Sequence, residues 1–255
     1  VFNDYDFEGN PMGFRPRTVR ALAGACHRIR HLHLADSIGV DFHKTGFAPY
    51  ISSLFLVKNS EDFRLLSRSP EQMPYLYQFG GHKPGMFTLE ASRAGTGVLA
   101  AVANLRLFGK AGLRATLGHL VEMTQLLREY LESHEGIAVL NRENFGTVTL
   151  FRAYPEGVDT FAIKSHEFED AAFRENLLRY NHYNRCIFDY IHQEALAGRG
   201  VIISFTDCYR RTAYGEPIVA MKSFILSPFV DEDNVELLVQ KVLEARQKAD
   251  ECKII

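Results

Sequence analysis

Apolar and polar residues along this chain follow two periods, one typical of helices and one typical of strands. Helical segments carry apolar residues at three- and four-residue spacing, and in the first of them Pro16 suits the opening turn while Val19, Leu22 and Cys26 follow. The helices predicted in this way cover residues 16–30, 92–108, 113–133, 168–197 and 231–248. The helix at residues 92–108 is rich in Ala and Leu, so we expect it to be buried. Polar residues at 181–184 weaken the prediction of the helix at residues 168–197.

Short apolar runs bounded by turn residues predict the strands. They cover residues 32–44, 50–57, 137–140, 147–151, 201–205 and 218–225. The first run leads into a turn at Thr45-Gly46, and the second, YISSLFLV, is apolar enough to be well buried. Between residues 60 and 85 the chain lacks periodicity and is interrupted by prolines, a pattern that is common in functional loops or lids.

The order of these elements predicts an α/β protein with two parts. Helix, strand and lid come first, two long helices follow, and a region that mixes strands and helices ends the chain. We expect part of a large α/β domain at residues 1–118. A linker helix and a smaller α+β domain are expected at residues 119–255.

Composition narrows the classes of function. Hydrophobic residues make up 46% of the chain and its net charge is −2, which argues against disorder. The 29 basic residues balance 31 acidic ones, so we expect neither a nucleic-acid nor a membrane partner. The 4 cysteines form no C-x-x-C pair, which favours a reducing, cytoplasmic setting without disulfides or a thiolate zinc site.

Several common signatures are absent from the sequence. There is no phosphate-binding P-loop, no H-E-x-x-H, no G-x-S-x-G and no G-x-G-x-x-G. His27 and His31 are four residues apart, but we interpret them as a solvated helix end and predict no metal site. The chain begins with Val1 and without a signal peptide, so we expect it to be the interior of a longer polypeptide.

The segment ADSIGVDFHKTGFAPY, residues 35–50, carries the most chemistry. In an extended strand Ser37, Asp41 and His43 would lie on one face. Lys44 follows among apolar residues, and we expect these surroundings to lower its pKa. A neutral lysine amine can form a Schiff base with a carbonyl group.

This segment resembles the lysine motif of the group II pyridoxal-phosphate-dependent amino-acid decarboxylases, the family of glutamate, aromatic-amino-acid and tyrosine decarboxylases. Phe42 stands where that family usually has Pro. TLEASRAG at residues 88–95 resembles the segment after the family's mobile loop, and residues 104–131 resemble its G-x-x-G-L turn and long helix. The resemblance implies the fold-type I architecture of pyridoxal-phosphate enzymes, with this chain as the C-terminal half.

The resemblance also implies roles for individual residues. Lys44 would form the Schiff base with pyridoxal 5'-phosphate, and His43 would lie beside the cofactor. Ser37 and Asp41 would support the phosphate and the lysine strand, although a polar pair at a turn and strand end explains them equally well. Arg93 would contact the active site or a dimer interface, or would simply be a charge at the start of a helix.

Residues 69–85 correspond in position to the family's mobile loop, which carries a tyrosine that protonates the substrate carbanion. Tyr75 and Tyr77 are the candidates for this proton donor, and an ordinary aromatic anchor is an equally good interpretation of each. His82 and Lys83 lie in the same segment and are further candidates. Closure of such a loop would exclude water from the reaction.

The expected function is therefore decarboxylation of an L-amino acid to its amine and CO2. The alternatives are other fold-type I chemistry, such as a carbon–carbon lyase or an aminotransferase, or a non-catalytic half-subunit that needs a partner chain. The family's Asp that pairs with the pyridine nitrogen, its ring-stacking residue and its phosphate cradle have no match here. We therefore expect a missing N-terminal half, and the resemblance implies a homodimer with shared active sites.

Overall fold

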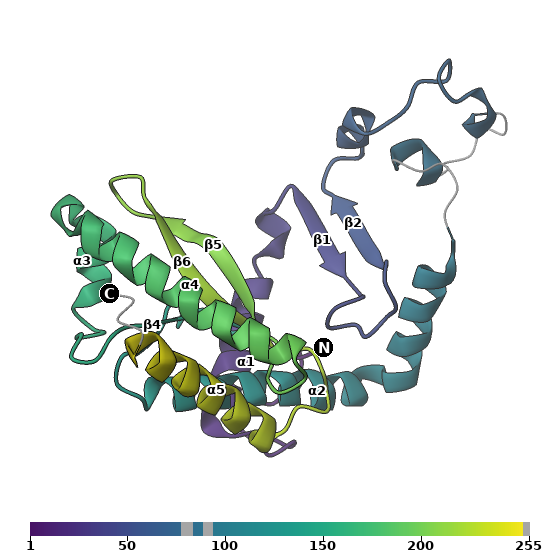
Figure 1. The fold of residues 1–255 in the computed structure, drawn as a ribbon. Helices are drawn as coiled ribbons and strands as arrows, with labels where there is room; N and C mark the ends of the chain where they lie inside the picture. Colours follow the sequence, from purple (N-terminus) through teal and green to yellow (C-terminus); the bar gives the residue numbers. More distant parts are fainter. Residues whose placement is uncertain (78–83, 89–93, 252–255) are drawn as a thin grey trace. The chain divides into compact units, whose positions relative to one another are not determined.

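The computed structural model describes residues 1–77, 84–88 and 94–251. Contacts divide the chain into two compact units (Figure 1). One comprises Val1–Asp4 and Cys26–Ala115, and the other comprises Tyr5–Ala25 and Thr116–Ile255. Within the described residues, no helix combines the length and the apolar character needed to cross a lipid bilayer.

The first unit is built around a two-stranded antiparallel sheet. Its strands are β1 (Ser37–Asp41) and β2 (Ser53–Val57), with Gly39 opposite Phe55. The segment predicted to be irregular contains short 3-10 helices, and one more precedes β1. These are η1 (Leu32–Leu34), η2 (Ser60–Leu65), η3 (Pro74–Leu76) and η4 (Pro84–Phe87). The predicted strand–turn–strand order is therefore confirmed, but β1 is shorter than the strand predicted at residues 32–44, because residues 32–34 form η1 and His43 lies in the turn.

The predicted burial of the second strand is wrong. Leu54, Phe55 and Leu56 on β2 are 41%, 49% and 47% exposed. Because successive side chains of a strand point to opposite faces, this run leaves apolar groups uncovered on both sides of the sheet. A continuous apolar run is typical of a strand covered on both faces, and the described residues form no such layers over this hairpin.

The helix α2 (Thr96–Glu132) contributes residues to both units and contains the predicted break between two helices. At Gly109 the backbone has φ 55° and ψ −168°, a conformation that favours glycine and interrupts the helix. Before the break, the expected burial is wrong for most apolar positions. Val98, Leu99 and Leu107 are largely exposed, because no described residue packs over them.

The helix α1 (Pro16–Ile29) confirms the first helix prediction. Its first part belongs to the second unit and runs along α2. The Arg17 guanidinium donates to Gln125 Oε1 at 3.2 Å and forms ion pairs with Glu129 and Glu132 at 3.4 and 3.3 Å. These contacts tie the two helices together within that unit.

The second unit contains a four-stranded antiparallel sheet in the order β3-β4-β6-β5. Its strands are β3 (Ile137–Val139), β4 (Val148–Ala153), β5 (Ser204–Arg211) and β6 (Pro217–Phe224). The remaining elements are α3 (Ile163–Glu169), η5 (Ala171–Phe173), α4 (Arg174–Leu196) and α5 (Glu232–Glu251). The predicted strands are confirmed, except that β5 begins at Ser204 and continues well past the predicted end.

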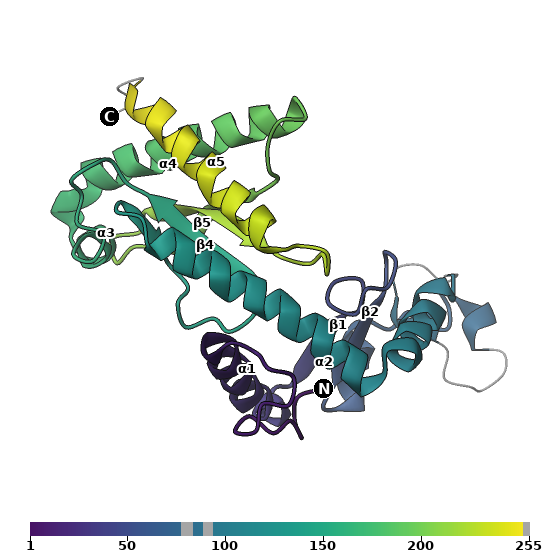
Figure 2. The same ribbon diagram turned by 90° about the horizontal axis from the view of Figure 1, so that it is seen from below.

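Helices cover both faces of this sheet, with α4 and α5 on one side and α2 on the other (Figure 2). Two residues of β4 point to opposite faces of the sheet. Thr149 accepts a hydrogen bond from Arg128 of α2, whereas Arg152, three residues on, donates to Asn181 of α4. Because both faces are covered, most residues of β4 and β6 are buried.

The polar residues 181–184, which weakened the prediction of α4, include a side chain that forms a buried contact with the sheet. Asn184 is fully buried, accepts a hydrogen bond from Ala153 N and donates to Ala153 O, each at 2.8 Å. The Asn184 amide therefore forms the same two kinds of hydrogen bond with the backbone of β4 that a neighbouring strand would form. The helix continues through this region without interruption.

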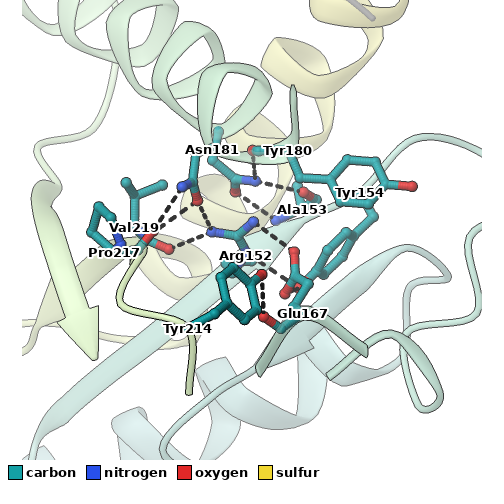
Figure 3. A network of polar contacts seen from close by, with 10 residues as sticks. Arg152, Ala153, Tyr154, Glu167, Tyr180, Asn181, Tyr214, Pro217 and Val219 are labelled. Atoms are coloured by element: carbon teal, nitrogen blue, oxygen red, sulfur yellow. Dashed lines mark hydrogen bonds and ion pairs between the residues drawn. The ribbon is translucent and has the colours of Figure 1, made fainter. Parts of the chain in front are cut away.

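A buried ion pair lies next to this contact (Figure 3). Arg152 donates to Glu167 Oε1 at 2.8 Å, and the two side chains are 0% and 3% exposed. Arg152 also donates to Asn181 Oδ1 at 2.8 Å and to Val219 O at 2.7 Å, and the Tyr154 hydroxyl donates to Glu167 Oε2 at 2.8 Å. Charges that are removed from water this completely need such partners.

Candidate active site

Lys44 lies in the turn that follows β1. Its amide donates to Asp41 O at 3.1 Å, which closes the turn, and its Nζ donates to Asp41 Oδ2 at 2.8 Å. The two side chains are 41% and 39% exposed, so the amine can be reached from solvent.

The charge state of Lys44 differs from the sequence-based expectation. The hydrogen bond and the charge of Asp41 raise the pKa of Lys44, and the same contact lowers the pKa of Asp41. We had predicted a lowered lysine pKa from the neighbouring apolar residues, and this prediction is wrong. The reason is that these neighbours do not bury the amine, whereas a carboxylate contacts it directly.

Ser53 completes a small polar cluster around Asp41. The ladder places Ser53 directly opposite Asp41, and its hydroxyl donates to Asp41 Oδ1 at 2.7 Å. This hydrogen bond also lowers the pKa of Asp41. Each carboxylate oxygen thus has a donor of its own, Ser53 on one side and Lys44 on the other.

His43 lies on the same side of the hairpin turn. Its Nδ1 is 3.0 Å from Ser52 O and 3.4 Å from Ser53 Oγ, and its ring packs against Tyr50 with 4.2 Å between ring centroids. The imidazole is therefore fixed through Nδ1 and through one ring face. The structure thus brings together Asp41, His43 and Lys44 of the predicted site residues.

Ser37 is not part of this cluster. It stands at the opposite end of β1, where it pairs with Val57. Asp41 is four positions further along the strand, which corresponds to roughly 13 Å. The two residues share a face of the strand, as the alternation predicts, but Ser37 contacts none of the residues around Lys44 in the described structure.

The two candidate tyrosines lie in or next to η3. The Tyr77 hydroxyl donates to the carbonyl oxygen of Arg68, and the Tyr75 side chain is exposed. Neither hydroxyl is bonded to Lys44 in the part of the chain that the structure describes. Arg93, His82 and Lys83 lie outside the described residues.

A second anchor, which the sequence analysis missed, holds the turn itself. Asn104 on α2 donates from Nδ2 to Gly46 O at 3.2 Å and to Phe47 O at 2.9 Å. Phe47 has φ 55°, an uncommon conformation for a residue other than glycine, and its ring lies 6.0 Å from that of Phe108. A polar residue at position 104 within an Ala- and Leu-rich helix was the available signal for this contact.

No group of three or more His, Cys, Asp or Glu side chains suited to a metal ion occurs among the described residues. The chemistry available at the turn is therefore that of a primary amine, a carboxylate, a hydroxyl and an imidazole. This set can form a covalent bond to an aldehyde and can accept the proton that the lysine must lose.

Comparison with known proteins shows what this arrangement is similar to. No protein-family model matches the sequence. The L-2,4-diaminobutyrate decarboxylase of Acinetobacter baumannii is 26% identical over 219 residues, which are 85% of this chain and 37% of that protein.

Solved structures share the fold. The glutamate decarboxylase domain of the diaminobutyrate-pyruvate transaminase and L-2,4-diaminobutyrate decarboxylase from Vibrio parahaemolyticus matches with a TM-score of 0.54 and 19% identity, over 89% of this chain and 38% of that one. The TDC of Oryza sativa, solved with PLP and tryptamine, matches with a TM-score of 0.61 and 15% identity, over 91% and 42%.

The predicted resemblance to the group II decarboxylases is confirmed. The α/β class and the fold-type I architecture are confirmed with it, since the solved structures cover most of this chain. The chain spans about two-fifths of the length of the decarboxylases that it matches. Within this decarboxylase fold, the cluster of Asp41, Ser53, His43 and Lys44 is the strongest candidate for an active site.

Proposed function

We propose that this protein acts in the pyridoxal-phosphate-dependent decarboxylation of an L-amino acid, with the cofactor bound to Lys44. The observation that carries the proposal is the position of an accessible lysine amine against a carboxylate, on a hairpin turn that also carries an imidazole, within a decarboxylase fold. Two relatives support the same chemistry, because the proteins from Acinetobacter baumannii and Vibrio parahaemolyticus, matched over most of this chain, are named as decarboxylases.

The residues at the turn fit an aldehyde cofactor at its point of attachment. Lys44 offers a half-exposed primary amine, and Asp41 Oδ2 lies 2.8 Å from it as a proton acceptor. Lys44 would therefore hold the cofactor covalently, with His43 beside it. When bound, pyridoxal phosphate supplies an electron sink for the electron pair left on Cα as CO2 departs.

The chain's own residues would divide the remaining tasks. Asp41 keeps Lys44 charged and oriented at rest, so the ammonium must lose its proton before the nitrogen lone pair becomes available. The Ser52 amide donates to His43 Nδ1 at 3.3 Å, and in the tautomer that accepts this hydrogen bond the Nε2–H group can donate to an anionic group. We assign Tyr77 or Tyr75 as the donor of the proton that Cα needs. Ser37 would support the phosphate and the lysine strand, and Arg93 would contact the active site or the dimer interface.

In this proposal, other parts of the active site come from polypeptide outside the present chain. The apolar residues exposed on β2 and on the start of α2 are what a covering segment would bury. We propose that an N-terminal half of the same enzyme covers them and brings the acid that pairs with the pyridine nitrogen. A homodimer with shared active sites, in the cytoplasm, completes the proposal.

Covalent trapping tests the position of the cofactor. The protein in its natural full length is incubated with pyridoxal phosphate, reduced with borohydride and digested, and the modified lysine is identified by mass spectrometry. We expect the label on Lys44 and its loss in Lys44→Arg. Lys58→Arg, on the same hairpin, is the matched control and should leave the label in place.

Product analysis tests the reaction. Supplied with L-amino acids, the protein should release equal amounts of CO2 and the corresponding amine, and Lys44→Arg should abolish both. Release of a keto acid or an aldehyde in place of CO2 and amine would favour aminotransferase or carbon–carbon lyase chemistry. A label on another lysine would contradict the site assignment.

A further inference from the structure

The Asp41 carboxylate is shared between two donors that come from different strands of the hairpin. Ser53 Oγ donates to Oδ1 at 2.7 Å, and Lys44 Nζ donates to Oδ2 at 2.8 Å. Ser53 stands directly opposite Asp41 in the ladder, so its short side chain is positioned by the backbone of β2. The hydroxyl is therefore a fixed anchor, whereas the lysine has a long and rotatable stem.

An exposed ion pair without such an anchor is weak. The Asp41 and Lys44 side chains are 39% and 41% exposed, and water competes for both charges at this level of exposure. Holding two side chains in one geometry also costs rotational freedom. The hydrogen bond from Ser53 removes part of this freedom from the carboxylate before the lysine binds it.

We propose that Ser53 is a positioning residue that orients Asp41 and thereby sets when the Lys44 amine becomes free to react. The proposal rests on the proposed function, in which Lys44 holds the cofactor. It adds a residue from the second strand of the hairpin that has no role in the proposed chemistry itself.

The other titratable groups around the pair are few. His43 Nδ1 lies 3.4 Å from Ser53 Oγ, and Tyr50 packs against the His43 ring. The hydrogen bond to Asp41 is the main cause of the raised Lys44 pKa, followed by the charge of Asp41, with a smaller contribution from Tyr50. Loss of the anchored carboxylate should therefore lower the Lys44 pKa toward its ordinary value.

The test measures the reactivity of Lys44 without the cofactor. The full-length protein is treated with hydroxylamine to remove any bound aldehyde and is labelled with acetic anhydride at a series of pH values. Acetylation of Lys44 is quantified by peptide mass spectrometry. Asp41→Asn, which removes the charge of the pair, provides the reference curve.

We expect Ser53→Ala to shift the labelling curve of Lys44 to lower pH, most of the way to the Asp41→Asn curve. A surface pair supports a modest change, which we expect to appear as roughly threefold more labelling at a pH below the midpoint. Ser53→Thr keeps the hydroxyl and should overlay the unmodified protein. Ser67→Ala removes an exposed serine whose hydroxyl donates to Arg64 O, and it is the matched control.

Two results would overturn the proposal. One is a Ser53→Ala curve that overlays the unmodified protein while Asp41→Asn is shifted. The other is an Asp41→Asn curve that shows no shift, since Asp41 would then not control the amine. Because the labelling needs no cofactor, a shifted curve together with a failed trapping experiment would reject the proposed function and leave the role of Ser53 intact.

Discussion

Two ion pairs in this protein have the same distance between nitrogen and oxygen but lie in different surroundings. Arg152 and Glu167 approach to 2.8 Å with side chains 0% and 3% exposed, whereas Lys44 and Asp41 approach to 2.8 Å with 41% and 39% exposed. The first pair lies beneath α4, and its hydrogen-bonding groups meet protein partners. The second pair is open to solvent at a turn.

This difference indicates different uses of the same chemistry. A buried pair cannot lose one member without leaving an unpaired charge away from water, so it specifies one packing arrangement. An exposed pair contributes little to stability, and its members remain free to exchange protons and partners. A lysine that must bind and release a cofactor therefore fits the second environment, and the first is suited to holding α3 against the sheet.

The largest effect is expected from breaking the buried pair. Glu167→Ala leaves the Arg152 guanidinium without its carboxylate and should lower the free energy of unfolding by about 3–5 kcal/mol. Chemical unfolding followed by circular dichroism measures the loss. Glu169→Ala, on the exposed side of the same helix, is the control and should have little effect. A similar loss in both variants would show that burial does not distinguish the two positions.

The buried tyrosines should make the fold sensitive to alkaline pH. Burial raises the pKa of Tyr154 and of Tyr183, while both titrate near 10 in an unfolded chain. Above pH 10 the unfolded state therefore binds fewer protons than the folded state, and stability falls with pH by about 1.4 kcal/mol per pH unit for each tyrosine. Unfolding measured at a series of pH values from 8 to 11 tests this, and Tyr154→Phe should reduce the slope. An unchanged slope would contradict it.

Loss of the Asn104 side chain should affect the turn more than the whole fold. Asn104→Ala removes the donors to Gly46 O and Phe47 O and should destabilise the turn by about 1 kcal/mol. Hydrogen exchange of the amides at positions 46–48 should accelerate several-fold, while exchange in β4 stays unchanged. Asn104→Asp has the same shape without the donors, so it should behave like the Ala variant. Slow exchange in both variants would contradict the role of this side chain.

The smallest effect on stability is expected at the exposed pair. Lys44→Ala and Asp41→Asn should leave the unfolding midpoint unchanged within the precision of the measurement, because exposed pairs contribute little. The same Lys44→Ala variant should lose all covalent cofactor, as judged by absorbance after dialysis against buffer. A large fall in stability would mean that the pair serves the fold, and it would remove the contrast between the two regions.

Local sequence was enough to locate most elements. The break in α2 could be read from its glycines, because Gly109 adopts a positive φ that other residues avoid. The motif around Lys44 was also visible, since adjacent residues of a strand and turn stay close whatever the rest of the chain does. Burial was harder to predict. An apolar run such as Leu54 to Leu56 indicates that burial of these side chains is favourable. It does not indicate which residues pack over them.

Other features depended on pairs of residues far apart in the sequence. Ser53 and Asn104 reach the Lys44 turn from β2 and α2, and neither segment by itself shows which residues its polar side chain contacts. Residues 181–184 were interpreted as weak helix, yet Asn184 is fully buried because it pairs with the backbone of β4. Arg152 and Glu167 are likewise separated by a loop and belong to different elements.

The sequence by itself determined the order of helices and strands, the lysine motif and the resemblance to the decarboxylases, because these depend on periodicity and on neighbouring residues. Only the tertiary structure decided the charge state of Lys44. Neighbours in the sequence suggested an apolar site and a lowered pKa, whereas the fold leaves the amine exposed and places a carboxylate, oriented by the opposite strand, against it. A pKa follows from the groups that surround an atom in space, and the pairing of two strands sets which groups those are.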